Sequence, residues 1–430
     1  MEDEGFGFDE FSVEMGDYEV IKTGKYNYSF WLNSEGGSID NKPLVHNGMI
    51  YFGSMNRNIY ALDLKSGKEK WRHEVQDRIG LSSPQLYKDS LIIGSYDYNV
   101  YRIDLKTGEM IWKFHTNGEL ASSGAVMDGV YYFTGRDQFI YAINCEDGSL
   151  VWKFRTFEAN VSVPTIHKNM IFFGSSDRNL YCLDRKNGSL IWKFGTEEEV
   201  VNVTPFQIIG NGIHFGTQGN ILYAVDIITG KEKWRINTGE YGMSRGQIIL
   251  DGMLIQPTNG GNVFAVTPAG KVVWKISSNH PFGAFATDGE RLYAGCEDHH
   301  LYCLDKNGKT VWKFRTEAPI WQPSTILDGI VYFGSYDCNL YALDAADGTL
   351  MWKFRCPGGI SIYPPIKSFF EFKINVPKAE AEEEMPGIYG INVSEGAAGT
   401  GAYKSRITYQ LGTHYREKGR YQKDADEEAF

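Results

Sequence analysis

Two adjacent histidines in a short acidic segment have the side chains best suited to metal chemistry. They are His299 and His300, which follow Glu297 in the sequence Glu-Asp-His-His. Neighbouring side chains on a strand point to opposite faces, so one histidine at most could act together with Glu297. A transition-metal site needs three or four converging ligands. We therefore expect a polar hairpin here, with metal binding as the alternative.

A recurring carboxylate could act as a general acid or base. Six aspartates stand three or four residues before a glycine: Asp63, Asp104, Asp184, Asp226, Asp305 and Asp344. Six equivalent copies do not fit a single catalytic centre, whereas an aspartate in this position typically holds a turn by accepting backbone N–H groups. The chain has no GxSxG turn, no HExxH motif and no phosphate-binding glycine loop. We expect no catalytic residue, and a nucleophile assembled from distant segments is the alternative.

The elements that position these residues are copies of one unit. Tryptophan recurs at spacings of 41, 40, 40, 42, 40, 38 and 40 residues, and a glycine stands four residues before each tryptophan. The eight tryptophans are Trp71, Trp112, Trp152, Trp192, Trp234, Trp274, Trp312 and Trp352. In one unit, turn-forming residues separate short apolar stretches at 162–167, 170–175, 179–184 and 189–194. Each unit is therefore predicted to form four antiparallel strands.

Radial stacking of these units predicts an all-β propeller. A four-stranded unit cannot bury both of its faces alone, and a closed ring of units buries them while leaving short, protected edges. We expect eight complete repeats, with each tryptophan burying ~150–250 Å² against the neighbouring blade. Trp31 is a ninth copy of the repeated tryptophan, and 368–374 and 387–396 resemble a second and a third strand. They predict a split ninth unit that joins the ends of the chain, with 403–410 as a second candidate for its outer strand.

Departures from the repeat are candidates for function. Trp321 fits no repeat position and lies where an outer strand passes to the next inner strand, and Phe282 is its counterpart by analogy. We expect partner contacts at Trp321, Phe282 and the flanking loops. Pro257 replaces the glycine of the second strand in the sixth unit, which predicts a weaker or irregular strand.

The composition divides the chain into three segments. Residues 1–22 are predicted to be an acidic, disordered tail. Residues 23–396 form the propeller, interrupted by an acidic insertion at 375–386, and 397–430 are a basic, aromatic extension with an acidic end.

Both ends of the chain carry possible binding motifs. The first 20 residues contain eight acidic side chains and no basic one, with Phe6, Phe8 and Phe11 among them. This segment is predicted to be a solubilising tail, or a motif whose phenylalanines dock into a groove of a partner. Residues 403–423 hold six lysines or arginines, one glutamate and four interleaved tyrosines. Such a stretch can bind single-stranded nucleic acid, and an edge strand with a solvated tail is the alternative. The net charge of −11 argues against general binding to duplexes.

The sequence favours a cytoplasmic chain without a membrane span. No apolar run approaches the ~18–20 residues that cross a bilayer, and the N-terminus lacks the basic and apolar regions of a secretory signal. The six cysteines show no CxxC pair, so we expect reduced thiols. Cys182 and Cys303 occupy the same repeat position three units apart, beyond the ~7 Å between Cα atoms that a disulfide allows. Both are predicted to be small apolar packing residues.

The segment GSYDCNLYALDAADGTLMWKF (334–354) and its copies resemble the PQQ-like repeat, the propeller unit of quinoprotein alcohol dehydrogenases. The resemblance covers roughly residues 26–396. It implies a propeller, in a family that includes dehydrogenases binding pyrroloquinoline quinone and calcium and non-catalytic scaffolds such as a lipoprotein of the outer-membrane assembly machinery. The dehydrogenases have an adjacent Cys-Cys pair, which this sequence lacks. We expect a non-catalytic scaffold for protein–protein interaction, without a cofactor. A quinone- or carbohydrate-binding enzyme is the first alternative, and a nucleic-acid-associated factor acting through 403–423 is the second.

Overall fold

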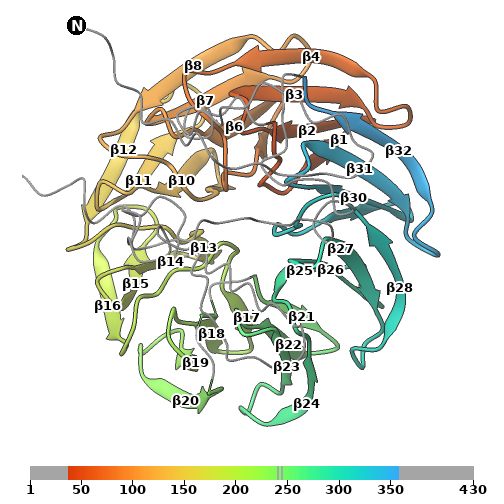
Figure 1. Cartoon of the computed structure of the whole chain (residues 1–430). Helices are drawn as coiled ribbons and strands as arrows, with labels where there is room; N and C mark the ends of the chain where they lie inside the picture. Colours follow the sequence, from red (N-terminus) through yellow and green to blue (C-terminus); the bar gives the residue numbers. More distant parts are fainter. Residues whose placement is uncertain (1–36, 240–241, 244–245, 358–430) are drawn as a thin grey trace, which may run out of the picture. The chain divides into compact units, whose positions relative to one another are not determined.

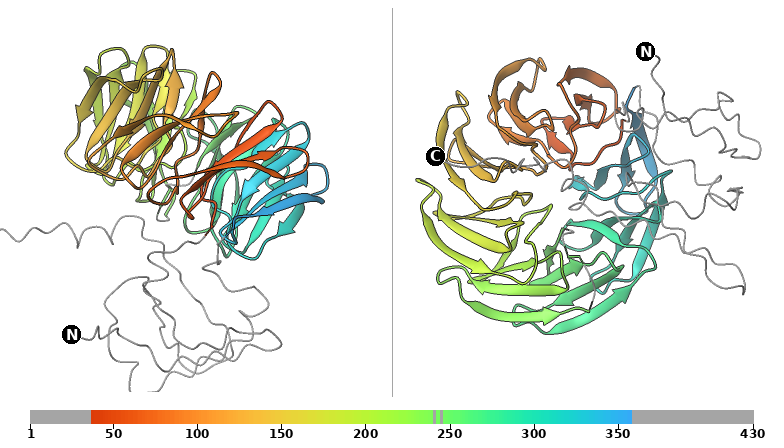
Figure 2. Two further views of the ribbon diagram at one scale, coloured as in Figure 1. Left: turned by 90° about the horizontal axis from the view of Figure 1, so that it is seen from above. Right: turned by 60° about the vertical axis from the view of Figure 1, so that its left-hand side comes forward.

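The propeller is built from eight sheets of four antiparallel strands. The structure, a computed structural model, describes residues 37–239, 242–243 and 246–357, and the secondary structure of these residues is entirely strands and turns. The sheets follow one another in sequence order around a ring, and the last strand of each lies at the outer edge (Figure 1). The further views in Figure 2 show the same succession of blades. The predicted all-β propeller of four-stranded blades is confirmed.

Each blade is one continuous stretch of chain. Blades 1 to 4 consist of β1 (Leu44–His46), β2 (Met49–Gly53), β3 (Asn58–Asp63), β4 (Glu69–Glu74), β5 (Gln85–Tyr87), β6 (Ser90–Gly94), β7 (Asn99–Asp104), β8 (Met110–His115), β9 (Ala125–Met127), β10 (Val130–Thr134), β11 (Phe139–Asn144), β12 (Leu150–Arg155), β13 (Thr165–His167), β14 (Met170–Ser175), β15 (Asn179–Asp184) and β16 (Leu190–Gly195). Blades 5 to 8 consist of β17 (Gln207–Ile209), β18 (Gly212–Gly216), β19 (Ile221–Asp226), β20 (Glu232–Asn237), β21 (Ile248–Leu250), β22 (Met253–Pro257), β23 (Asn262–Val266), β24 (Val272–Ser277), β25 (Phe282–Thr287), β26 (Leu292–Cys296), β27 (His300–Leu304), β28 (Thr310–Arg315), β29 (Thr325–Leu327), β30 (Ile330–Gly334), β31 (Asn339–Asp344) and β32 (Leu350–Arg355).

Local sequence explains the hairpins within a blade. Between β1 and β2, Asn47 and Gly48 both have positive φ angles, 49° and 73°, as a tight two-residue turn of type I′ requires. Pro257 is the last residue of β22 and pairs with Val263 in regular register, so the irregular alternative is wrong, while a weaker strand stays a prediction. At the end of a strand, the missing proline N–H costs the ladder little.

Each outer strand has a bulge next to its tryptophan. In blade 3, Ala142 is opposite Trp152 and the next residue, Ile143, is opposite Leu150, so Val151 is the extra residue. The same register shift occurs in all eight blades. Such bulges increase strand twist and blunt an exposed edge, which protects the rim from pairing with other chains.

The hydrophobic core lies between the blades. Each of eight buried apolar clusters draws its residues from two neighbouring blades. The cluster between blades 8 and 1 includes Tyr332 and Leu340 from one side and Ile39 and Phe52 from the other. Because the first and last blades share a core of the same kind as the others, the ring is closed.

Blade 8 contacts blade 1 directly at the closing seam. The Ile39 N–H donates to the Ser335 carbonyl at 3.2 Å, and the Tyr336 hydroxyl donates to Asp40 at 2.7 Å. Eight blades therefore complete the ring among the described residues. The parts assigned to a split ninth unit lie outside these residues, as do both terminal segments and the 375–386 insertion: 26–32 with Trp31, 368–374, 387–396 and 403–410.

Candidate functional site

The repeated tryptophans join each blade to the next. Trp152 Nε1 donates to the Arg185 carbonyl of blade 4 at 2.9 Å, and a Cβ placed on Gly188 would lie 2.6 Å from Trp152 Cε3. At each equivalent glycine, the tryptophan of the preceding blade lies within 4 Å of such a Cβ. The pairs are Trp71 with Gly108, Trp112 with Gly148, Trp152 with Gly188, Trp192 with Gly230, Trp234 with Gly270, Trp274 with Gly308, Trp312 with Gly348 and Trp352 with Gly67. The eight indoles therefore serve the ring.

The aspartates before these glycines hold turns, as predicted. Asp104 Oδ1 accepts the backbone N–H groups of Lys106 at 2.9 Å and of Thr107 at 2.8 Å. Hydrogen bonds from the Thr107 and Lys106 N–H groups favour the ionised form, so the pKa of Asp104 is lowered. A carboxylate stabilised in this way is a poor general base.

A second set of aspartates lies in the turns between the second and third strands, and in blades 2, 3, 4 and 8 it links the turn to the loop entering the blade. Asp177 Oδ2 accepts the Tyr181 hydroxyl at 2.7 Å and the Phe157 N–H at 3.2 Å. Burial of the hydroxyl raises the pKa of Tyr181, and the negative charge of Asp177 adds a smaller increase. The five such pairs are Asp97 with Tyr101, Asp137 with Tyr141, Asp177 with Tyr181, Asp298 with Tyr302 and Asp337 with Tyr341. Sequence reasoning missed this set, although its Asp-x-x-x-Tyr spacing recurs in five units.

The cysteines are buried, free thiols. All six are buried, in agreement with packing roles for Cys182 and Cys303. Burial raises the pKa of Cys145 and of Cys182 to about 12. The thiolate is the nucleophilic form, so these side chains are unreactive near neutral pH.

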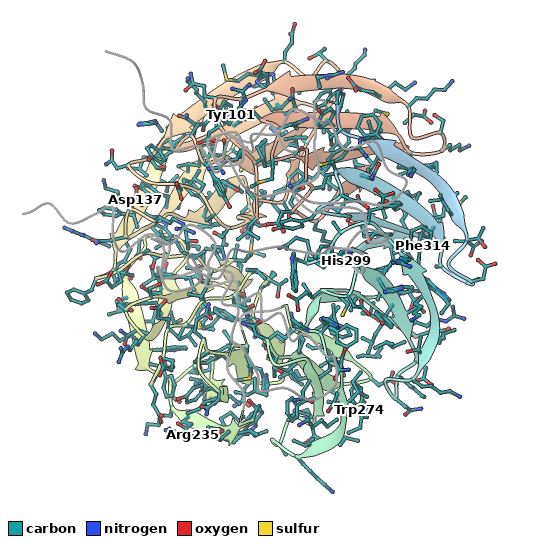
Figure 3. The ribbon with its side chains drawn as sticks, in the orientation of Figure 1. Tyr101, Asp137, Arg235, Trp274, His299 and Phe314 are labelled. Atoms are coloured by element: carbon teal, nitrogen blue, oxygen red, sulfur yellow. The ribbon has the colours of Figure 1, made fainter. Side chains whose placement is uncertain are left out.

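The Glu-Asp-His-His segment is a polar hairpin in blade 7. His299 has a positive φ of 69°, and Asp298 Oδ1 accepts the His300 N–H at 3.1 Å. The carboxylate of Glu297 lies 3.7 Å from the ring of His280, outside the segment. Within the part of the chain that the structure describes, no three His, Cys, Asp or Glu side chains are grouped as metal ligands. Figure 3 shows His299 nearer the middle of the ring than Trp274.

Trp321 and Phe282 are buried, and the Trp321 backbone contacts Gly283 and Ala284, the two residues after Phe282. Their side chains are 4% and 5% exposed, and the Trp321 carbonyl accepts the Ala284 N–H at 2.8 Å. Phe282 packs edge-on against Tyr302 with ring centroids 5.4 Å apart. Buried side chains offer no surface to a partner. Partner contact at these two positions stays a prediction without support from this geometry, as does contact through Phe6, Phe8 and Phe11, which lie outside the described residues.

Phe157 is the most exposed aromatic residue among those that the structure describes. Phe157, in the loop after β12, is 77% exposed, and Phe139 at the start of β11 is partly exposed. Lys153 Nζ lies 4.6 Å from the centroid of the Phe139 ring, and Lys193 Nζ lies 6.0 Å from that of Phe157. Together with Arg155, which also lies over Phe139, these residues are here called the blade 3 rim. Figure 3 labels Asp137, two residues before Phe139, at the outer part of the ring.

Sequence reasoning missed the blade 3 rim. Asparagine begins the third strand in five blades, and phenylalanine replaces it at Phe139. Comparison of the eight units column by column would have found this substitution. It would also have found Phe157, because the corresponding residues in the other units are polar, glycine or proline.

Comparison with known proteins identifies relatives for most of the propeller. A family model described as "Outer membrane protein assembly factor BamB" matches residues 20–113, 96–247 and 259–361. BamB of Bordetella pertussis is 27% identical over 110 residues, which are 23% of this chain and 28% of that protein. BamB of Yersinia pestis is 23% identical over 163 residues, 34% of this chain and 41% of that protein. The matched stretches thus span less than half the length of these curated relatives.

Solved structures with the same fold include a BamB protein and an alcohol dehydrogenase. BamB from Moraxella catarrhalis superposes with a TM-score of 0.60 at 14% identity, covering 72% of this chain and 95% of that one. Quinohemoprotein alcohol dehydrogenase from Comamonas testosteroni superposes with a TM-score of 0.60 at 13% identity, covering 77% and 76%. No helix long and apolar enough to cross a membrane occurs in the described residues. The chain belongs to the PQQ-like β-propeller repeat family whose model is named for BamB.

Proposed function

We propose that the chain is a non-catalytic propeller scaffold that binds a protein partner. The strongest support is that the polar groups recurring in the repeats make hydrogen bonds within the ring. The tryptophan N–H groups bond to the next blade, the two sets of aspartates hold turns and loops, and the thiols are buried with raised pKa values. These groups are therefore engaged in holding the blades together.

Family membership supports a more specific form of the proposal. The curated BamB relatives carry the name outer membrane protein assembly factor. If this chain has the same role, its partner is a component of the machinery that assembles outer-membrane proteins. The cytoplasmic location that the sequence suggests is a competing proposal about compartment. Fractionation of the native cells distinguishes these locations. The scaffold proposal itself does not depend on the compartment.

Site-specific photo-crosslinking in native cells tests the scaffold proposal. A photoreactive amino acid would replace one exposed residue per variant, at Met110, Val151, Ile228 and Met351 and at Phe157, so that several blades are sampled. We expect a discrete adduct of constant mass at one position or at neighbouring positions. The absence of an adduct at every position, in protein that remains folded, would count against a scaffold.

A ligand test separates the scaffold from a quinone enzyme. Pyrroloquinoline quinone with calcium would be added to the full chain, and the melting temperature would be measured. The scaffold proposal predicts no change. A ligand that binds only the folded state raises its stability by mass action, so a clear upward shift would favour the enzyme.

A further inference from the structure

We propose that the interface between blades 5 and 6 binds a monovalent cation through neutral side-chain oxygen atoms. The residues concerned are Thr204, in the loop that enters blade 5, and Gln247 and Gln256 of blade 6, together here called the blade 5–6 site. This inference goes beyond the proposed scaffold function and does not depend on it.

The blade 5–6 site contains buried oxygen atoms that lack a hydrogen-bond partner. Gln256 is 0% exposed, Gln247 is 2% exposed and Thr204 is 8% exposed. Among the described residues, no group hydrogen-bonds to Gln247 Oε1, Gln256 Oε1 or Thr204 Oγ1. Buried polar atoms in folded proteins nearly always have a partner, so such exceptions indicate a bound water, ion or ligand.

Gln247 and Gln256 stand opposite each other across two strands. The antiparallel register of β21 and β22 pairs Ile248 with Ile255, and its next step places Gln247 opposite Gln256. Side chains paired in this way point to the same face of the sheet, with Cβ atoms about 4.5–5.5 Å apart. The two amide groups are therefore neighbours.

Both glutamines face blade 5, from which Thr204 meets them. Gln247 Nε2 donates to the carbonyl of His214 in β18, and the residue two places before Gln256 packs in the apolar cluster shared with blade 5. A Cβ placed on Gly246, next to Gln247 in the chain, would lie 2.9 Å from Thr204 Oγ1. The three residues thus belong to one part of the interface.

Gln256 departs from the repeat at this position. The fourth residue of the second strand is phenylalanine in five other blades: Phe52, Phe133, Phe173, Phe215 and Phe333. Each of these rings packs in the cluster shared with the preceding blade. A buried amide in place of a ring breaks this packing rule, which is expected where a function requires it.

The glutamine atoms left free are hydrogen-bond acceptors. Gln256 Nε2 donates to the Pro257 carbonyl at 2.7 Å, and Gln247 Nε2 donates to His214, so each amide keeps its oxygen for the site. Asn202, two residues before Thr204 and 0% exposed, adds an amide whose two polar atoms also lack a partner. Neutral oxygens of this kind bind cations through their dipoles, as the carbonyl oxygens of potassium channels do.

The absence of charge from the blade 5–6 site favours a monovalent ion. Calcium sites include carboxylates, and among the described residues no three His, Cys, Asp or Glu side chains form a metal-binding group. Burial lowers the pKa of His214, so this neighbour is neutral at pH 7. The net charge of −11 attracts cations to the chain. Buried water can satisfy the same acceptors and is the alternative that an experiment has to exclude.

Thermal unfolding of the full chain in different salts tests the proposal. The melting temperature would be measured in potassium, sodium and choline chloride at equal ionic strength, because choline is too large for a buried site. We expect it to be higher in potassium or sodium chloride than in choline chloride by at least about 2 °C, since an ion that binds only the folded state stabilises it by mass action. Equal melting temperatures in the three salts would show that water satisfies these atoms and would overturn the proposal.

Two variants remove oxygen atoms from the site. Gln256→Phe copies five other blades, and it is expected to abolish the difference between salts while raising the melting temperature in choline chloride. Thr204→Val removes one hydroxyl and should reduce the difference. The control is Thr134→Val, which removes a buried hydroxyl that already donates to the Ser162 carbonyl at 2.8 Å. It should lower the melting temperature equally in all three salts.

The location of the effect is tested separately. Amide hydrogen exchange in β21 and β22 should be slower in the favoured salt than in choline chloride, with little change in blades 1 and 2. Arg245 precedes Gly246 in the sequence and lies outside the described residues, and Arg245→Ala should retain the difference between salts. A difference that persists in Gln256→Phe, disappears in Arg245→Ala, or slows exchange equally in all blades would place the ion elsewhere and overturn the blade 5–6 site.

Discussion

Adding one methyl group at the closing seam tests the packing of the ring. Gly67 lies beneath Trp352, where a Cβ would be 2.6 Å from Cε3, far inside the ~3.5–4.0 Å that two carbons prefer. Gly48 has nearly the same backbone, with φ at 73° against 65°, but nothing lies within 4 Å of its Cβ. Gly48→Ala therefore isolates the conformational cost of alanine at positive φ, about 1 kcal/mol. Gly67→Ala adds the clash with the indole, so its total cost is about 3 kcal/mol.

The assay is urea unfolding followed by circular dichroism, with the two alanine variants compared under identical conditions. A second comparison places Gly67→Ala in a chain that also carries Trp352→Leu. Once the indole is gone, Gly67→Ala should cost no more than Gly48→Ala does in the unmodified chain. Equal costs for the two alanine variants in the unmodified chain, or no relief from Trp352→Leu, would refute the idea that the indole fills this space.

Three further results are expected. Burial lowers the pKa of His299 to about 4, so the unfolded state, with a pKa of about 6.5, binds the proton first. Stability therefore falls as the pH drops from 6.5 to 4, by about 1–2 kcal/mol because the ring is partly exposed and solvent screens its charge. His299→Asn, which tolerates positive φ, removes this loss in pH-dependent urea titrations. In the folded chain at neutral pH, a thiol reagent should modify none of the six cysteines rapidly, whereas in denaturant it should modify all six. Rapid labelling of Cys182 in the folded chain would contradict its burial. The cluster between blades 5 and 6 has five described buried apolar residues, against eleven between blades 4 and 5. Amide hydrogen exchange should therefore be faster at the interface of blades 5 and 6 than at that of blades 4 and 5. Slower exchange at the interface of blades 5 and 6 would oppose this reasoning.

The blades were predictable because their contacts follow from spacing. Trp152 and Gly188 lie 36 residues apart, and the same pairing recurs at every interface, so the tryptophan and glycine periods encode the packing of neighbours. The number of blades in the ring was not encoded locally. Trp31 looks like a further copy, yet closure depends on the accumulated rotation from blade to blade, and Trp352 already contacts Gly67.

The candidate site was less predictable than the fold. Trp321 and Phe282 were chosen because they break the repeat. Trp321 precedes the inner strand β29, Phe282 begins the inner strand β25, and both are buried. Phe139 and Phe157 break the repeat pattern next to turns. The backbone at these turns is the same as in other blades, and only the side chain differs. The sequence pattern therefore shows which residues are unusual, whereas the surface each one faces depends on the assembled ring.

The most direct test of the account is the stability of a chain limited to residues 37–357. If eight blades complete the ring, this chain should fold with the near-ultraviolet circular dichroism of the full protein and unfold at a similar urea concentration. A chain that fails to fold, or unfolds at a much lower urea concentration, would show that segments outside these residues complete the ring, and it would contradict the direct closure of blade 8 on blade 1.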